Sequence, residues 1–213
     1  MGKTIFAAGE HYHICNRGVD KRKIFMDGKD LNRFLKSVEI FNTIEPVGSI
    51  YEYMLDRRLG RVTSRKGRLV DIVCYCLNPN HFHLLVRQQV ENGVSEFVKR
   101  LVGGYTKYFN HRHNRSGVLF AGKFRSTHIV SNEYLLHVSA YINLNNEVHG
   151  IKQAIKSSWE EYIGNTNKKL CNTAIILKQF QDAREYKDFA RASLADIIAR
   201  KSLSKELEGS LLE

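Results

Sequence analysis

Apolar residues recur along this chain with two different spacings. Between residues 30 and 45 they return every three or four positions, which predicts an amphipathic helix with Asp30 as its N-cap and Pro46 just beyond its end. The same spacing predicts a second helix from Ser95 to about His113 and a third from Ser131 to about Gly150. These three segments are therefore expected to pack one apolar face against the rest of the protein.

Shorter stretches rich in β-branched and aromatic residues predict strands. Four such stretches lie at residues 11–17, 69–77, 81–87 and 118–130. Since only the turn Asn78-Pro79-Asn80 separates the second stretch from the third, these two strands are expected to pair antiparallel. The order of strands and helices predicts an α+β fold in which helices pack on an antiparallel sheet.

Two further segments are less regular. In residues 47–68, several arginines and lysines surround Gly60 and Gly67, so we expect an exposed basic insertion there. A strand over residues 47–55 and a hairpin after it would suit this composition. Residues 170–213 are expected to form two helices. We therefore divide the chain into a main domain over residues 1–165 and a C-terminal helical extension over residues 166–213.

The charge of the chain is strongly unbalanced. It carries 33 lysines and arginines against 22 aspartates and glutamates, which gives a net charge of +11. A surplus of this size favours a polyanionic partner, although a merely basic soluble protein would have it too. No apolar run approaches the length of a membrane span, and the N-terminal apolar run is too short for a secretory signal. We expect a cytoplasmic, nucleoid-associated protein with no membrane partner.

The cysteines do not indicate a zinc knuckle. Cys74 and Cys76 are separated by one residue, which is closer than the pairs of such sites, and no second pair follows. We expect both thiols to fill the core.

Two histidines stand one residue apart in the strand predicted at residues 81–87. Side chains alternate across a strand, so His81 and His83 share a face and can hold one metal ion, although such a pair is often accidental. Tyr141 and Asn145 lie one turn apart on the third predicted helix, and an Asn oxygen is a hard ligand suited to Mg²⁺ or Mn²⁺. A tyrosine hydroxyl beside such a metal could attack a phosphodiester, whereas periodicity alone favours a half-buried helix aromatic.

Five segments, in their order along the chain, resemble the HUH single-tyrosine transposases, which are also called IS200-like transposases. Within this family, the resemblance is to the REP-associated tyrosine transposases. The segments are YHICNRGVDKRKIF, NPNHFHLLV, YTKYFNHRHNRSGVLFAGKFRS, YLLHVSAYINLNNEVHG and SSWEEYIG. The resemblance covers roughly residues 8–165 and implies a ferredoxin-like (RRM-like) catalytic domain. It implies Tyr141 as the nucleophile and Mg²⁺ or Mn²⁺ bound by His81, His83 and Asn145.

The resemblance also implies a reaction and a partner. Single-stranded or hairpin DNA would be cleaved through a 5′-phosphotyrosine and then transferred, as in DNA transposition, by a monomer or a homodimer. Asn146 stands where chains of this family usually have Pro, which leaves Tyr141 and Asn145 in place. Six basic residues that flank the proposed site residues in the sequence are candidate DNA contacts: Arg17, Lys107, Arg112, Arg115, Lys123 and Arg125.

Two other functions stay open from the sequence. One is a non-catalytic or domesticated, sequence-specific nucleic-acid-binding protein on the same fold, and the other is a metal-dependent nuclease that uses water as its nucleophile. All three ligand candidates and the tyrosine are present, which favours the transposase. Tyr105, Tyr108 and Tyr134 have no Asn one turn later, so Tyr141 is preferred on spacing as well.

Overall fold

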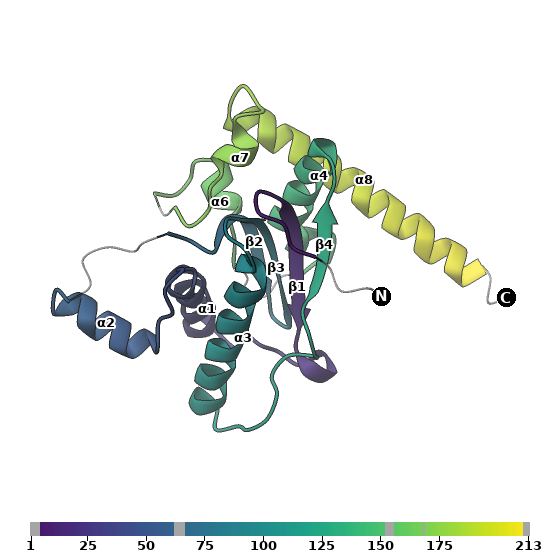
Figure 1. Cartoon of the computed structure of the whole chain (residues 1–213). Helices are drawn as coiled ribbons and strands as arrows, with labels where there is room; N and C mark the ends of the chain where they lie inside the picture. Colours follow the sequence, from purple (N-terminus) through teal and green to yellow (C-terminus); the bar gives the residue numbers. More distant parts are fainter. Residues whose placement is uncertain (1–4, 62–66, 152–155, 168, 211–213) are drawn as a thin grey trace.

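The computed structural model describes residues 5–61, 67–151, 156–167 and 169–210, and it confirms the predicted α+β fold. Within these residues a five-stranded antiparallel sheet has the order β4-β1-β3-β2-β5 (Figure 1). Its strands are β1 (His11–Arg17), β2 (Val70–Asn78), β3 (His81–Gln88), β4 (Arg125–Ile129) and β5 (Lys156–Ser157). The predicted antiparallel pairing of the two strands beside the Pro79 turn is therefore confirmed.

One face of the sheet is covered by α1 (Gly28–Phe41) and α3 (Gly93–Arg112) (Figure 1). Alternation along β1 and β3 turns Tyr12, Phe82 and Leu84 to this face, where all three are buried. The two helices approach closely at Gly104, because a Cβ there would lie 2.4 Å from the ring of Phe41. The alternate residues of the same strands, including the histidines, consequently point to the opposite face.

That opposite face is covered by α4 (Asn132–Asn143), α5 (Asn145–Val148) and α8 (Ala183–Ser210). Cys74 and Cys76 are fully buried there, which confirms that these thiols fill the core. The short helices α6 (Trp159–Tyr162) and α7 (Ala174–Leu177) precede α8 in the chain.

The two helices predicted after residue 170 are present as α7 and α8. Tyr186 of α8 lies in the same hydrophobic cluster as α4, and its hydroxyl accepts a hydrogen bond from the amide of Asn143 at 2.9 Å. The division of the chain at residue 165 stays a prediction. Among the described residues, no helix combines the length and the apolar character needed to cross a membrane.

The first predicted helix has different ends from those expected. It begins at Gly28 because Asp27 is the N-cap, and one carboxylate oxygen of Asp27 accepts from two backbone N–H groups of the first turn. Asp30 is fully buried instead and accepts from the backbone N–H of Met26 at 2.9 Å. The prediction of Asp30 as the cap was therefore wrong, and the helix ends at Phe41.

The other two predicted helices also shift at their ends. α3 begins after Asn92, whose backbone is left-handed at φ 57°, and not at Ser95. α4 begins after Ser131 as predicted, and the Ser131 hydroxyl accepts from the backbone N–H of Tyr134. α4 ends at Asn143, and the single turn of α5 begins at Asn145 after Leu144. Residues 132–148 therefore form two helices where one was predicted.

Residues 47–55 do not contain the predicted strand. They contribute to α2 (Ile50–Arg58), which projects away from the sheet (Figure 1). The Ser49 hydroxyl accepts from the backbone N–H of Glu52 and donates to its carboxylate, so a local cap favours the helix over the strand. Residues 62–66 of the predicted basic insertion lie outside the described residues, whereas Arg57 and Arg61 are exposed.

The strand predicted over residues 118–130 is shorter, because β4 spans only Arg125–Ile129. Gly117 and Gly122 have φ values of 80° and 70°, which bend the chain before β4 begins. Leu119 and Phe120 between these glycines are buried in the core from a loop.

Candidate active site

The histidine pair lies on β3, on the sheet face that α4 covers. His83 is opposite Cys76 of β2 and Cys15 of β1, so it occupies the middle of the sheet and is 8% exposed. His81 is one pleat nearer the end of the strand, and the two imidazole ring centroids are 5.0 Å apart. The predicted orientation of both histidines to one face is therefore confirmed.

Hydrogen bonds define which nitrogen of His81 carries the proton. Nδ1 lies 2.7 Å from Oδ1 of Asn80, an atom that can only accept, so the proton is on Nδ1. Nε2 then has a lone pair, which accepts from Nδ2 of Asn78 at 2.9 Å. Burial lowers the pKa of His81, and the Asn145 side chain acts in the opposite direction. Asn78 is the last residue of β2 and Asn80 belongs to the turn before β3, so these two residues orient the histidine.

Asn145 is the first residue of α5 and is fully buried. Its Oδ1 accepts from Nδ2 of Asn78 at 2.7 Å. Its own Nδ2 is buried and has no hydrogen-bond partner among the described residues. One nitrogen of Asn78 thus contacts both the His81 lone pair and the Asn145 oxygen. Because Nε2 of His81 and Oδ1 of Asn145 both accept from this one donor, the two atoms face the same point. A nitrogen and an oxygen that face one point could both bind a divalent cation there.

Tyr141 lies in the last turns of α4, above the same histidines. The centroid of its half-buried ring is 5.8 Å from that of His83 and 6.3 Å from that of His13. Burial raises the pKa of Tyr141, and the Asn145 side chain acts against this rise. The four predicted residues, His81, His83, Asn145 and Tyr141, are therefore brought together in the structure.

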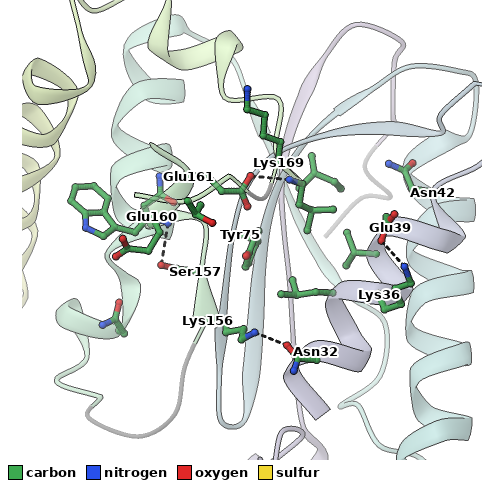
Figure 2. Close-up of a pocket in the computed structure, with 18 of the residues that line it drawn as sticks. Asn32, Lys36, Glu39, Asn42, Tyr75, Lys156, Ser157, Glu160, Glu161 and Lys169 are labelled. Carbon is green, nitrogen blue, oxygen red and sulfur yellow. Dashed lines mark hydrogen bonds and ion pairs between the residues drawn. The ribbon is translucent and has the colours of Figure 1, made fainter. Parts of the chain in front are cut away.

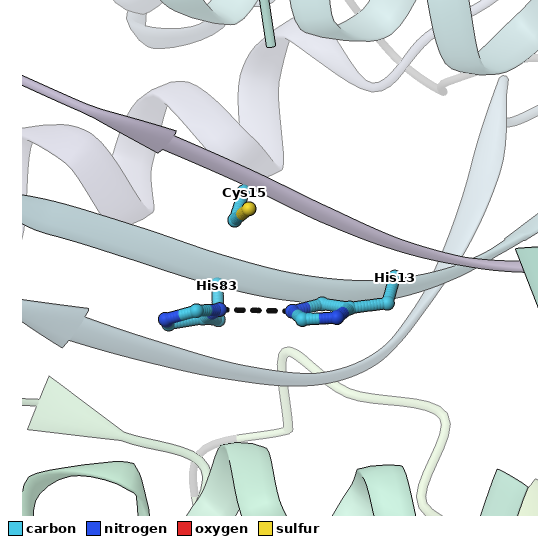
Figure 3. A group of neighbouring side chains, drawn as sticks. All are labelled: His13, Cys15 and His83. Carbon is cyan, nitrogen blue, oxygen red and sulfur yellow. Dashed lines mark hydrogen bonds between the residues drawn. The ribbon is translucent and has the colours of Figure 1, made fainter. Parts of the chain in front are cut away.

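Two neighbours of His83 were missing from the sequence prediction. Nε2 of His13 lies 2.8 Å from Nδ1 of His83, and the two rings stack with their centroids 5.1 Å apart (Figure 3). Cys15 is two residues further along β1, and the nitrogen and sulfur donor atoms of His13, Cys15 and His83 all lie within 4.8 Å of one another. The alternation of His13 with Cys15 was visible in the sequence, but the pairing of β1 with β3 was not.

Burial keeps this cluster uncharged. It lowers the pKa of His13 to about 4, and it holds the pKa of His83 well below the usual histidine range. The pKa of the Cys15 thiol is raised by burial, with a smaller opposing effect from Arg125. At neutral pH the two imidazoles are therefore unprotonated at one nitrogen each, and each has a lone pair for a ligand.

Three of the predicted DNA-binding cations are exposed along the edge of this site. Arg17 is opposite His81 in the sheet, and Arg125 of β4 is opposite Cys15. Lys123 lies two residues before Arg125 and is also exposed. Lys107 is exposed as well, but on α3, the helix that packs on the other face of the sheet.

The remaining two predicted cations make bonds within the fold. The Arg112 guanidinium is ion-paired with Asp27 at 2.6 Å and with the buried carboxylate of Asp30. Arg115 donates to the backbone carbonyl of Val118 at 3.0 Å. These bonds give both arginines a structural role, while a DNA contact by either residue stays a prediction.

A cleft of 1120 Å³ lies beside the candidate site, along the β5 edge of the sheet (Figure 2). Both signs of charge line it, with Lys36, Lys156 and Lys169 on one hand and Glu39 and Glu160 on the other. Its lining includes Leu144 and Asn146, the neighbours of Asn145, but not the histidine pair or Tyr141. The cleft is therefore separate from the cluster of proposed catalytic groups.

Comparison with known proteins places this site in context. Residues 55–145 match the family model described as "Transposase IS200 like". Among solved structures, a REP-associated tyrosine transposase bound to a REP hairpin is 13% identical, with a TM-score of 0.50, over 80% of this chain and 88% of its own. A putative transposase from Deinococcus radiodurans R1 is 14% identical, with a TM-score of 0.37, over 72% of this chain and 100% of its own. No curated protein matches significantly.

The first of these structures shares its fold with this chain. The family match contains the histidine strand, Tyr141 and Asn145, whereas two of the five segments that carry the resemblance, at residues 12–25 and 157–164, lie outside it. The predicted recognition is therefore confirmed over residues 55–145, which are similar to the IS200-like transposases.

Proposed function

We propose that this chain is a DNA transposase that cuts single-stranded or hairpin DNA with Tyr141 and transfers the cut strand. His81, His83 and Asn145 would hold the Mg²⁺ or Mn²⁺ that this reaction requires. The observation that carries the proposal is the convergence of the His81 lone pair and the Asn145 oxygen on one point, with Tyr141 in ring contact with His83.

The groups of the site suit an in-line displacement at phosphorus. The Tyr141 oxygen attacks the scissile phosphate, a bond forms from this oxygen to phosphorus, and the bond to the 3′ oxygen breaks. The phenol proton is released to solvent and the 3′ oxygen takes one up. A bound divalent ion would supply polarisation of the phosphate. Strand transfer is the same displacement in reverse, with the 3′-hydroxyl of another strand as the nucleophile.

Burial of Tyr141 supports a role for the metal in this step. The raised pKa of Tyr141 means that the phenol is protonated at neutral pH and is a weak nucleophile by itself. A cation beside it favours the phenolate, since an opposite charge stabilises the ionised form. The proposed reaction should consequently require the divalent ion.

The charge distribution supports DNA as the substrate. Arg17, Lys123 and Arg125 are exposed at the edge of the site, in a chain with a net charge of +11. Phosphates bound to these side chains would lie near Tyr141, as a scissile phosphate must. The REP hairpin in the similar solved structure is the reason for proposing hairpin DNA in particular.

The proposal is tested with labelled hairpin oligonucleotides incubated with protein and Mg²⁺ or Mn²⁺. We expect a covalent adduct that resists denaturation, disappears in Tyr141→Phe and persists in Tyr134→Phe, a matched change at an exposed tyrosine of the same helix. An adduct that persists in Tyr141→Phe would contradict the proposed nucleophile. Cleavage without an adduct would favour a water-using nuclease, and binding without cleavage would favour a non-catalytic DNA-binding protein.

A further inference from the structure

A second group of side chains that could hold a metal ion lies directly beside the proposed catalytic set. We propose that His13, Cys15 and His83 form a site for a thiophilic divalent ion, Zn²⁺ in particular, which shares His83 with the proposed Mg²⁺ or Mn²⁺ site. Zn²⁺ bound there would inhibit strand transfer. The inhibition rests on the proposed function, whereas the binding of Zn²⁺ does not.

Strand pairing fixes the three side chains relative to one another. His13 and Cys15 are alternate residues of β1 and share a face, and Cys15 is directly opposite His83 in the antiparallel pair. All three donor atoms lie within 4.8 Å of one another, and the two nitrogens are 2.8 Å apart. A tetrahedral Zn²⁺ needs its donors about 3.3 to 3.6 Å apart, as follows from metal–ligand distances of about 2.0 to 2.3 Å. Side-chain movements of about an ångström would therefore admit the ion.

The chemistry of the donors selects the ion. Two imidazoles and a thiolate are ligands typical of Zn²⁺, while Mg²⁺ and Mn²⁺ favour oxygen. The set that contains His81 and Asn145 has an oxygen, and the set that contains Cys15 has a sulfur. The two sets consequently differ in the metal that they prefer, although they have His83 in common.

Binding of Zn²⁺ requires two proton movements. The proton between His13 and His83 passes to the outer nitrogen of one ring, so that both facing nitrogens offer a lone pair. The Cys15 thiol releases its proton to solvent as sulfur binds the ion. Three protein ligands leave a fourth tetrahedral position open, and Tyr141 lies in ring contact with both histidines. An ion bound to these three residues would occupy His83, which the proposed Mg²⁺ or Mn²⁺ site also requires, and strand transfer would therefore be inhibited.

Co²⁺ is the probe for this site because Zn²⁺ has no visible spectrum. Co²⁺ added to the metal-free protein should give a thiolate-to-metal charge-transfer absorption, which Zn²⁺ should then abolish by displacement. We expect the absorption to disappear in Cys15→Ser. The Co²⁺ affinity of His13→Ala should fall more than about 100-fold, which exceeds the loss expected if His13 only formed a hydrogen bond to a ligand and did not bind the metal. Cys171→Ser is the matched control, since this free cysteine is not part of the cluster, and it should keep the absorption.

Circular dichroism of each variant shows whether it is folded. If Cys15→Ser does not fold, alkylation of Cys15 in the folded wild-type protein should block the absorption, with the labelled residue identified by mass spectrometry. The proposal is overturned if Co²⁺ gives no thiolate absorption in the wild-type protein, or if the absorption persists without the Cys15 thiol. Either result would leave the Tyr141 adduct unaffected, so it differs from a failure of the proposed transposase activity.

Discussion

The amide of Asn78 makes the convergence of the proposed metal ligands testable by a nearly isosteric change. Its nitrogen donates to Nε2 of His81 at 2.9 Å and to Oδ1 of Asn145 at 2.7 Å. Asn78→Asp replaces this donor with an acceptor and leaves the volume of the side chain almost unchanged. In a metal-free protein, the introduced carboxylate then faces two acceptors without a hydrogen atom between them.

The expected loss of stability follows from these two bonds. An acceptor that stays buried without its partner costs about 1 to 3 kcal/mol. Asn145 is fully buried and His81 is partly exposed. Loss of the hydrogen bond to His81 should therefore cost less than loss of the bond to Asn145. We expect the free energy of unfolding of Asn78→Asp to fall by about 2 to 4 kcal/mol in the presence of a chelator.

A divalent ion should reverse this loss, because the introduced carboxylate then becomes a ligand between the two acceptors. At a concentration one hundred times its Kd, Mn²⁺ should raise the free energy of unfolding by about 2.7 kcal/mol. Urea unfolding followed by circular dichroism, with chelator and with Mn²⁺, measures both effects.

Asn42→Asp is the matched control for this experiment. Asn42 is also buried, and its amide donates to the carbonyl of Val70 at 2.7 Å, far from the histidines in the fold. This variant should be destabilised as well, but Mn²⁺ should not restore it. Equal recovery of both variants, or full stability of Asn78→Asp in chelator, would refute the convergence of ligands at this point.

Three further predictions concern charged residues. Arg112→Ala should lower Tm in calorimetry by about 4 °C or more, because the buried carboxylate of Asp30 loses an ion pair. Lys107→Ala should leave Tm unchanged, and equal Tm values for the two variants would contradict the structural role of Arg112. Arg17→Ala and Arg125→Ala should each reduce the slope of log affinity for single-stranded DNA against log salt by about 0.7, and an unchanged slope would exclude a phosphate contact. Burial raises the pKa of Glu161, so its contribution to stability is complete below about pH 4.5 and is lost as pH rises through the raised value. Glu161→Gln should lack this loss in unfolding experiments across pH.

The strands and long helices could be predicted because their patterns are local. Alternation placed His81 and His83 on one face, and helical spacing placed Asn145 one turn after Tyr141. The strand predicted at residues 47–55 was wrong because the cap formed by Ser49 and Glu52 favours a helix there. This signal was present in the sequence, as Ser-x-x-Glu.

The neighbours of the histidines could not be predicted, since they depend on pairing between distant segments. His13 contacts His83 through the register of β1 with β3, and strand alternation does not specify a register. Arg112 was predicted as a DNA contact, but its partner Asp30 is 82 residues earlier in the chain and its burial has no local signature. Asn78 was interpreted as a turn residue, although it also donates to two proposed metal ligands.

Mass spectrometry of the covalent adduct tests the central proposal most directly. Wild-type protein incubated with a cleavable hairpin and Mn²⁺ would be digested, and the peptide that carries a nucleotide would be sequenced. We expect a 5′-phosphate linked to Tyr141, as the proposed mechanism requires. A nucleotide linked to any other residue, or DNA cleaved with no modified peptide, would contradict it.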